Sequence, residues 1–436
     1  MVEIAPFKGI YYNREKIDNL DDVMSPPYDI ISKEMQHKLY EKHPYNIVRL
    51  ILGKEYPDDT SENNRYTRAA KFLKEWLEKG VLIKSEKPAI YPYKIDYEIK
   101  GVKRRFNGFF VLLKLDPDYK QVKAHEKTLS KPKADRLNLM RTTYANLEPI
   151  ELLYVDEKDE VMKEIDNYIL NTEPAIDVIG YDGFKHRLWE VNDEKLISFL
   201  QSWMKDKILF IADGHHRYQT AIDFANEIRE KTGNRDENAP FNYMMVVIAN
   251  MFDKGLAILP THRLIKRNIS LEAILKGVEK YFEVEEKTLI SRDYEGQSKE
   301  IIKALEPKDR EHKFALYTGG DKYYIFTLKN ENILDKMMPN YSKTLRKLDV
   351  TILHKIILEP VMGINEANLE EHVKYTRDNV EAIKLVAEGK FDYSFLMNAT
   401  KIEELRDVAN AGEHMPQKST YFLPKMLSGL VMRKIE

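Results

Sequence analysis

The stretch KILFIADGHHRYQTAIDFANEIREKTG, residues 207–233, carries the clearest structural signal in the chain. Its apolar run over 207–212 predicts a buried strand, and the apolar spacing from His215 to about Lys231 predicts a helix. Gly214 stands between the two, where its backbone freedom permits a sharp turn. A helix that begins this way is a ready anion site, because its first N–H groups lack intrahelical partners and carry partial positive charge.

The residues around this turn suit a phosphate group. Gly214 lets a ligand approach the backbone closely, and Asp213 is placed to cap the helix. His215, His216 and Arg217 add hydrogen-bond donors in the first helical turn. A capped surface helix with solvated histidines is the alternative for the same residues, but two imidazoles and a guanidinium together favour the phosphate site.

On both sides of this stretch, helical and strand patterns alternate, which predicts an α/β protein of mixed α+β type. Helical spacing occurs over 32–44, 62–81, 133–147 and 158–171, and strand patterns occur over 89–99, 103–116, 148–155, 185–191 and 241–250. After Asn268 the pattern restarts, with helices over 270–282, 299–306, 348–361 and 378–389, a hairpin over 312–328 and a strand over 391–399. We expect a phosphate-binding domain with an N-terminal extension over residues 1–268, and a smaller α/β domain with a packed tail over 269–436.

The composition excludes several classes of function. With 69 Lys+Arg against 71 Asp+Glu, the net charge of −2 gives no support for a nucleic-acid or anionic-membrane surface. No apolar run reaches the ~18 residues of a membrane span, and the first residues show no secretion signal, so a cytoplasmic protein is expected. Cysteine is absent, which excludes disulfides, thiolate catalysis and cysteine-ligated zinc.

A second candidate segment is AHEKTLSKPKADR, residues 124–136. It contains His125, Glu126, Asp135 and Arg136, and such a mixture of carboxylates and bases suits proton abstraction, a metal ion, or a cation that contacts phosphate. A solvated charged loop is the alternative.

Three shorter motifs are further candidates. MSPPYDII presents Asp29 after two prolines, where it would bind a substrate ammonium or ribose, or cap the next helix. LPTHRLI places Arg263 after a predicted strand as a possible anion contact, and MPQKST places Lys418 before two hydroxyl residues. Histidines occur across these segments without the spacing of zinc enzymes, so contacts to phosphate oxygens are favoured for them; they are His125, His215, His216, His262 and His414.

Residues 212–221, ADGHHRYQTA, resemble the phosphate-binding motif of the ParB/sulfiredoxin superfamily, in which a strand leads through a glycine turn into a helix that opens with arginine. The free-serine kinases of that superfamily carry a form close to Asp-Gly-His-Thr-Arg, which is nearest to residues 213–217 here. His215 stands where sulfiredoxins carry cysteine, so the sulfiredoxin reaction is excluded.

The whole chain is identified as a member of the domain-of-unknown-function 1015 family. MSPPYDII, AHEKTLSKPKADR, IADGHHRYQTA and GEHMPQKSTYFLPK occur in this order, as in that family. Members are often encoded beside serine-biosynthesis genes, which implies serine or phosphoserine as the small-molecule substrate.

The resemblance and the residues together suggest phosphoryl transfer between a nucleotide, ATP or ADP, and a small hydroxyl compound. We expect the 213–217 turn, with Lys418, to bind the nucleotide phosphates. Glu126 or Asp135, with His125 beside them, would accept the hydroxyl proton or bind Mg²⁺, and Arg263 would neutralise transition-state charge. Since neither Arg217 nor Glu126 is assigned to a core, their replacement is expected to leave the melting temperature unchanged. The alternatives are a phosphoserine phosphatase and a non-catalytic nucleotide-dependent binding protein.

Overall fold

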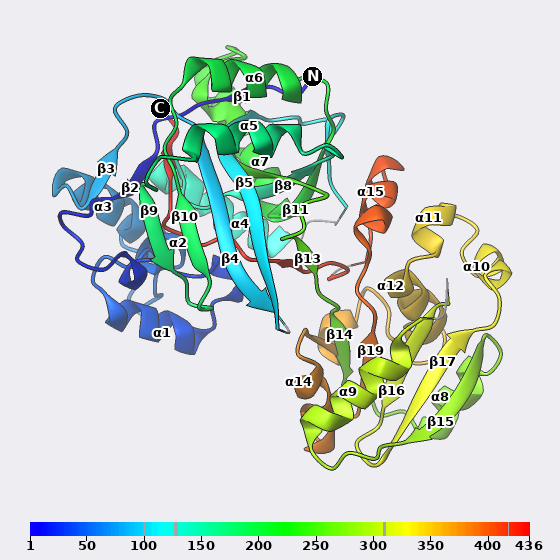
Figure 1. Ribbon diagram of the computed structural model, residues 1–436. Helices are drawn as coiled ribbons and strands as arrows, with labels where there is room; N and C mark the ends of the chain where they lie inside the picture. The colour runs from blue at the N-terminus through cyan, green and yellow to red at the C-terminus, as the bar shows by residue number, and fades with distance from the viewer. Residues whose placement is uncertain (100, 126–129, 308–310, 417) are drawn as a thin grey trace. The chain divides into compact units, whose positions relative to one another are not determined.

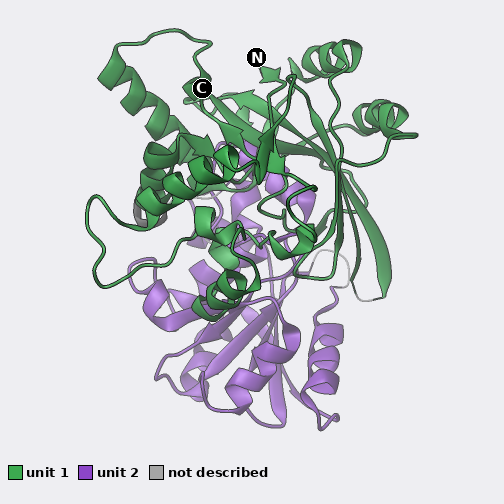
Figure 2. Ribbon diagram, turned by 90° about the vertical axis from the view of Figure 1, so that its left-hand side faces the viewer, with its two compact units in different colours: residues 1–124, 128–257, 424–436 green, residues 125–127, 258–423 purple. Residues whose placement is uncertain are grey.

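A computed structural model describes residues 1–99, 101–125, 130–307, 311–416 and 418–436 of the chain. The chain forms two compact units (Figure 2). Apart from the residues outside that description, unit 1 contains 1–124, 128–257 and 424–436, and unit 2 contains 125–127 and 258–423. Both units contain helices and a sheet, so the predicted mixed α/β class is confirmed (Figure 1).

The division of the chain differs from the predicted one. The chain enters unit 2 at Ile258 rather than near Asn268, and it returns to unit 1 at Pro424. The tail is packed, since Leu427, Leu430 and Met432 are buried. Its packing partners belong to unit 1. The apolar residues of the tail predict that it is packed, but not against which unit.

Unit 1 is built on a mixed sheet of nine strands among the described residues, in the order β6-β11-β8-β12-β5-β4-β10-β9, with β1 paired to β5. The β6·β11 and β8·β12 pairs are parallel and the other pairs antiparallel. The strands of unit 1, including the short pairs β2·β3 and β7·β21, are β1 Ile4–Ala5, β2 Ile10–Tyr12, β3 Leu82–Lys84, β4 Tyr91–Ile99, β5 Val102–Lys114, β6 Val122–Lys123, β7 Ala145–Asn146, β8 Ile150–Tyr154, β9 Ile176–Ile179, β10 Lys185–Leu188, β11 Leu209–Asp213, β12 Tyr243–Asn250 and β21 Arg433–Lys434.

Helices of unit 1 pack on this sheet through one large apolar core, to which α4, α5, α6 and α7 contribute. Alternate residues of the central strands enter that core, including Ile150 and Leu152 of β8 and Leu209 and Ile211 of β11. The helices of unit 1 are η1 Leu20–Asp22, η2 Tyr28–Ile30, α1 Lys33–Lys42, α2 Val48–Ile51, α3 Arg65–Glu78, α4 Ser130–Thr143, α5 Glu160–Ile169, α6 Glu194–Met204, α7 His215–Thr232 and η3 Pro240–Asn242.

Unit 2 has its own sheet of six strands among the described residues, in the order β15-β17-β16-β19-β14-β18, and a separate apolar core. Its strands are β14 His262–Ile265, β15 Phe282–Thr288, β16 Lys313–Tyr317, β17 Lys322–Leu328, β18 Val373–Thr376, β19 Tyr393–Met397 and β20 Phe422–Leu423, the last paired with β13 Ala257–Ile258 at the change of unit. Its helices are α8 Leu271–Val278, α9 Tyr294–Leu305, α10 Asn332–Met337, α11 Lys343–Arg346, α12 Asp349–Ile352, the π-helical turn η4 Leu353–Leu358, α13 Leu369–His372, α14 Asn379–Ala387 and α15 Ile402–Asn410.

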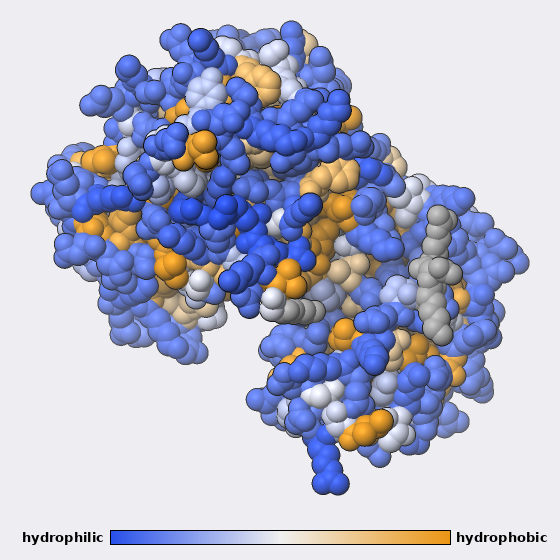
Figure 3. All heavy atoms as spheres, viewed as in Figure 1, coloured by the Kyte–Doolittle hydropathy of each residue, from blue (hydrophilic) through white to orange (hydrophobic). Residues whose placement is uncertain are grey.

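On the face of the molecule shown in Figure 3, hydrophilic residues predominate and hydrophobic ones occur in small groups. Within the ranges that the structure describes, no helix is long and apolar enough to cross a membrane.

Candidate functional site

The strand, turn and helix predicted around Gly214 are all present. β11 ends at Asp213, α7 begins at His215, and Gly214 adopts a φ of 94°. A left-handed backbone of this kind favours glycine, because a side chain there is strained. The predicted capping role of Asp213 is wrong, since no side chain caps α7.

Asp213 instead joins two cations. Its Oδ1 lies 2.5 Å from Lys425 Nζ, and its Oδ2 accepts a hydrogen bond of 2.6 Å from the Arg217 guanidinium. Burial opposes ionisation of this carboxyl, but the charges of Lys425 and Arg217 outweigh burial and hold the pKa of Asp213 well below its usual range. The carboxylate therefore fixes both cations beside the turn.

Arg217 is buried and not displayed on the surface. A second nitrogen of its guanidinium donates to the carbonyl oxygen of Pro149. Burial alone would lower the pKa of Arg217, but the neighbouring Asp213 and Glu148 raise it. The guanidinium is thus a permanently charged, pre-positioned group.

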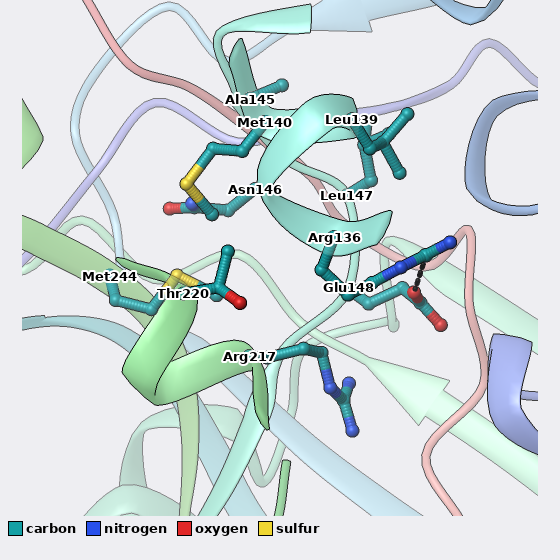
Figure 4. Close-up of a pocket in the computed structure, with 10 residues that line it drawn as sticks. All are labelled: Arg136, Leu139, Met140, Ala145, Asn146, Leu147, Glu148, Arg217, Thr220 and Met244. Carbon is teal, nitrogen blue, oxygen red and sulfur yellow. Dashed lines mark hydrogen bonds and ion pairs between the residues drawn. The ribbon is translucent and has the colours of Figure 1, made fainter. Parts of the chain in front are cut away.

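Arg217 also lines a narrow pocket in unit 1, with Arg136, Glu148 and Thr220 (Figure 4). The charged ends of Arg136, Glu148 and Arg217 lie on one side of this pocket, and Thr220 lies on the other with two methionines. Its volume of about 30 Å³ leaves room for a few atoms of water size. A nucleotide cannot enter it, although a single phosphate oxygen or a water molecule can.

Glu148 connects three segments that are far apart in the sequence. Its Oε1 accepts hydrogen bonds of 3.0 Å from the Tyr28 backbone N–H and from the Ser428 hydroxyl. Its Oε2 lies 3.5 Å from Arg136, whose guanidinium stands 3.8 Å from the centre of the Tyr28 ring. Burial raises the pKa of Glu148 against the charges of Arg217 and Arg136, which lower it.

Asp29, the candidate of the MSPPYDII motif, is exposed beside this cluster. Its charge acts on both Arg217 and Glu148. The alternative role as a helix cap does not apply, because Ser32 caps α1 by accepting from the Met35 N–H at 3.1 Å.

The predicted segment 124–136 is divided by the fold. Asp135 and Arg136 lie in unit 1, His125 belongs to unit 2, and Glu126 lies outside the described residues. Asp135 contacts the guanidinium groups of Arg65 and Arg136, and its Oδ1 accepts a bond of 2.8 Å from the Tyr66 hydroxyl. Burial alone would raise the pKa of Asp135, but Arg136, Tyr66 and Arg65 together lower it.

In unit 2, the C-terminal motif that contains Lys418 contacts residues of two other predicted motifs, His125 and Arg263. His125 Nε2 lies 3.1 Å from the Thr420 hydroxyl. Arg263 is buried, and its guanidinium donates to the carbonyl oxygen of Lys418 at 3.3 Å. Burial lowers the pKa of Arg263 to about 10. Lys418 itself has a left-handed backbone, with a φ of 56°, so the Arg263 side chain supports a strained turn.

The two histidines of the turn differ in exposure. His215 is buried and close enough to Asp213 for its charge to lower the pKa of that carboxyl, whereas His216 is half-buried.

The sequence interpretation missed Glu148, Glu151 and Lys425. Glu148 and Glu151 stand in EPIELLYV, where the apolar neighbours predict a buried strand, so charged residues inside that run were the available signal. Lys425 ends the FLPK segment of the C-terminal motif, but nothing local indicates its partner.

Over the described part of the chain, no group of three or more histidines and carboxylates could hold a metal ion. The oxygens of Asp135, a predicted Mg²⁺ ligand, are engaged by two guanidinium groups and a hydroxyl. This donor arrangement fits arginines rather than Mg²⁺.

Comparison with known families assigns the chain. Residues 4–351 match the family described as "Protein of unknown function (DUF1015)". The match covers well over half of the sequence, and the chain belongs to this family.

Solved structures with a partly similar arrangement are distant in sequence. A mutant of free serine kinase in complex with ADP has 15% identity and a TM-score of 0.36, over 72% of this chain and 87% of that one. A conserved hypothetical protein from Pyrococcus furiosus has 14% identity and a TM-score of 0.35, over 75% and 95%. SbnI with a C-terminal truncation, from Staphylococcus aureus, has 9% identity and a TM-score of 0.34, over 73% and 85%. A sequence comparison with proteins of curated function found no match.

Proposed function

We propose that this protein transfers a phosphoryl group between a nucleotide, ATP or ADP, and a small hydroxyl compound. The observation that carries the proposal is the gathering of Arg136, Arg217 and Lys425 beside the glycine turn that opens α7. Phosphoryl transfer depends mainly on positioning and on stabilising negative charge, and fixed cations supply both. Free serine is the proposed acceptor, because the ADGHHR motif and the family resemblance imply it.

The cations of the cluster are held in place before a ligand arrives. Asp213 orients Lys425 and Arg217, and Glu148 lies against Arg136. Little reorganisation is then needed when phosphate oxygens approach, which is the condition for electrostatic stabilisation of a transition state. The exposed carboxylate of Asp29 is the proposed contact for the ammonium group of serine.

The proton acceptor is proposed to be a carboxylate of the 124–136 segment. Asp135 is a weak base, because its neighbouring arginines hold its pKa low. Its contacts suit the orientation of Arg136, and Glu126 is therefore the first candidate for the base. The contacts of Asp135 do not fit a metal ion, so no step is assigned to Mg²⁺ at this residue.

The test is an activity assay on the full chain. ATP, ADP and pyrophosphate are each incubated with serine and Mg²⁺, and phosphoserine is detected by phosphorus NMR. We expect phosphoserine to form with one of these donors, and Arg217→Met to abolish its formation. Arg346→Met is the matched control, because Arg346 pairs with Asp335 in unit 2 and has no part in the cluster.

Two outcomes would replace the proposal. Release of inorganic phosphate from phosphoserine without any nucleotide would identify a phosphatase. Tight nucleotide binding without turnover of any small hydroxyl compound would identify a nucleotide-dependent binding protein.

A further inference from the structure

Glu151 occupies an unusual position on the central sheet of unit 1. All residues of β8 are buried, and its neighbours Ile150 and Leu152 enter the helix-covered core. Because side chains alternate along a strand, Glu151 points to the opposite face of the sheet. A register shift between Ile211 and Asp213 brings Asp213 of β11 opposite Glu151 across the ladder, so the two carboxyl side chains share that face.

The carboxyl of Glu151 lacks the contacts that an ionised group requires. The residue is 2% exposed, and neither Oε1 nor Oε2 has a hydrogen-bond partner among the described residues. A buried carboxylate without donors is strongly disfavoured, whereas a neutral carboxylic acid is tolerated. A buried carboxyl with both oxygens unpartnered is rare in folded proteins and calls for an explanation.

Four charged or titratable groups act electrostatically with Glu151, whereas its partner on the neighbouring strand β12 is the apolar Val247. They are Asp213 of β11, Arg217 of α7, Lys425 of the C-terminal segment and Tyr93 of β4. Burial raises the pKa of Glu151 to about 8, a rise that Asp213 supports and that Lys425 and Arg217 oppose. The two carboxyls on this face therefore differ in charge near neutral pH, with Asp213 ionised and Glu151 protonated.

We propose that Glu151 is a positioning residue of the anion site, and that the site binds its anion when Glu151 carries a proton. With Glu151 neutral, Lys425 pairs with Asp213, and Asp213 in turn orients Arg217. Loss of the proton places a second negative charge beside Asp213. That charge competes for Lys425 and repels an anion at the turn. The nature of the anion rests on the proposed function, but the protonation of Glu151 does not.

The first experiment measures the affinity of the full chain for ADP between about pH 7 and about pH 9.5, a range that brackets the pKa of about 8. A terminal phosphate loses its last proton near about pH 6, so ADP itself changes little above about pH 8. We expect the affinity of the wild type to fall by about tenfold over this range, the effect of one unit charge a few ångströms from the ligand. A wild-type affinity that stays constant overturns the proposal, whatever happens to the variants.

Two variants identify the group responsible. Glu151→Gln keeps the shape of the neutral acid and should bind ADP with an affinity that no longer falls with pH. Glu404→Gln is the matched control, because burial raises the pKa of Glu404 too, but this residue lies in unit 2 and should leave the pH dependence unchanged. An equal pH dependence in Glu151→Gln and in the wild type overturns the proposal.

The second experiment does not depend on a ligand. Infrared spectroscopy detects the carbonyl stretch of a protonated carboxyl, and we expect a band at pH 7 that disappears in Glu151→Gln and titrates near about pH 8. Glu148→Gln controls the assignment, because Glu148 is also buried with a raised pKa. A band that disappears in Glu148→Gln alone contradicts the proposal. If no nucleotide binds while the band behaves as expected, the proposed function fails and the protonation of Glu151 stands.

Discussion

At the scale of one residue, Arg217 is a proposed binding group that also holds the structure together. Its guanidinium joins the carboxylate of Asp213 to the backbone at Pro149, and its charge acts on the buried Glu148. The expectation that its removal would leave the melting temperature unchanged therefore does not follow from the structure. A residue that a phosphate motif places at a surface is here buried and paired with the half-buried carboxylate of Asp213.

The corresponding prediction is that Arg217→Ala destabilises the protein by roughly 1–3 kcal/mol, because Asp213 keeps Lys425 but loses its second cation, and the buried carbonyl of Pro149 loses its donor. The stability of Arg217→Lys should lie between that of the wild type and that of Arg217→Ala, since lysine keeps the positive charge but lacks the planar guanidinium. Denaturant unfolding at neutral pH measures both. Arg235→Ala, at an exposed position, is the control and should unfold as the wild type does. Equal midpoints for Arg217→Ala and Arg235→Ala would contradict a stabilising role for the Arg217–Asp213 ion pair.

A second prediction concerns Asp213 and acid. Its pKa in the folded state is lower than in the unfolded chain, so the ionised group stabilises the fold above about pH 4. That stabilisation is lost as the pH falls toward the lower folded-state value. Unfolding midpoints measured from about pH 6 to about pH 2 should therefore decline less steeply in Asp213→Asn than in the wild type. Parallel declines would show that Asp213 does not carry this pH dependence.

At the scale of elements, α7 is flanked by two glycines with a left-handed backbone, Gly214 before it and Gly233 after it, so the two positions can be compared directly. A Cβ at Gly214 would meet the Arg217 side chain, with Nε at 3.1 Å, whereas a Cβ at Gly233 would meet nothing within 4 Å. Gly233→Ala should therefore cost about 1 kcal/mol of stability, from backbone strain alone. Gly214→Ala should cost more and should also raise the KM for the nucleotide, because Arg217 must move. Unfolding and kinetics on both variants check this, and equal effects would contradict a special role for the turn.

The same scale shows what the sequence could predict. The turn at Gly214 was identified because strand, glycine and helix signals follow one another without interruption over residues 207–233. Local patterns also placed β8 and α4, since each has a continuous run of suitable residues. The predicted role of Asp213 as the cap of α7 is wrong for a physical reason. A backbone N–H of the helix is the expected partner of its carboxylate, but Lys425, distant in sequence, offers a full positive charge instead.

Long-range partners account for what the sequence did not predict at the site. Glu148 depends on Tyr28 and Ser428, and Asp213 depends on Lys425. The periodicity of a local segment cannot predict such pairs, because they depend on which strands become neighbours in the sheet and which loops cover them. Within the segment 124–136, the charge pattern could not show that His125 and Asp135 belong to different units.

At the scale of the whole molecule, the two units have separate cores, so we expect two unfolding transitions. All three tryptophans, Trp76, Trp189 and Trp203, lie in unit 1, which also holds the proposed anion site. ADP should therefore raise the midpoint of the unfolding transition that tryptophan fluorescence reports. The free energy of unfolding of unit 1 should increase by RT ln(1 + [L]/Kd). Circular dichroism reports both units and should show a second transition that ADP leaves unchanged. A ligand shift confined to that second transition would move the site to unit 2.

The return of residues 424–436 to unit 1 has a consequence for biosynthesis. A ribosome makes the chain from the N-terminus, so Lys425 emerges only after all of unit 2 has been translated. Until then Asp213 lacks its lysine, and the hydrogen bond from Ser428 to Glu148 cannot form. In a nascent or prematurely terminated chain, Asp213 thus retains Arg217 alone as its cation, and Glu148 retains Arg136 and the Tyr28 N–H. We therefore expect a chain that ends before Pro424 to lack a complete anion site.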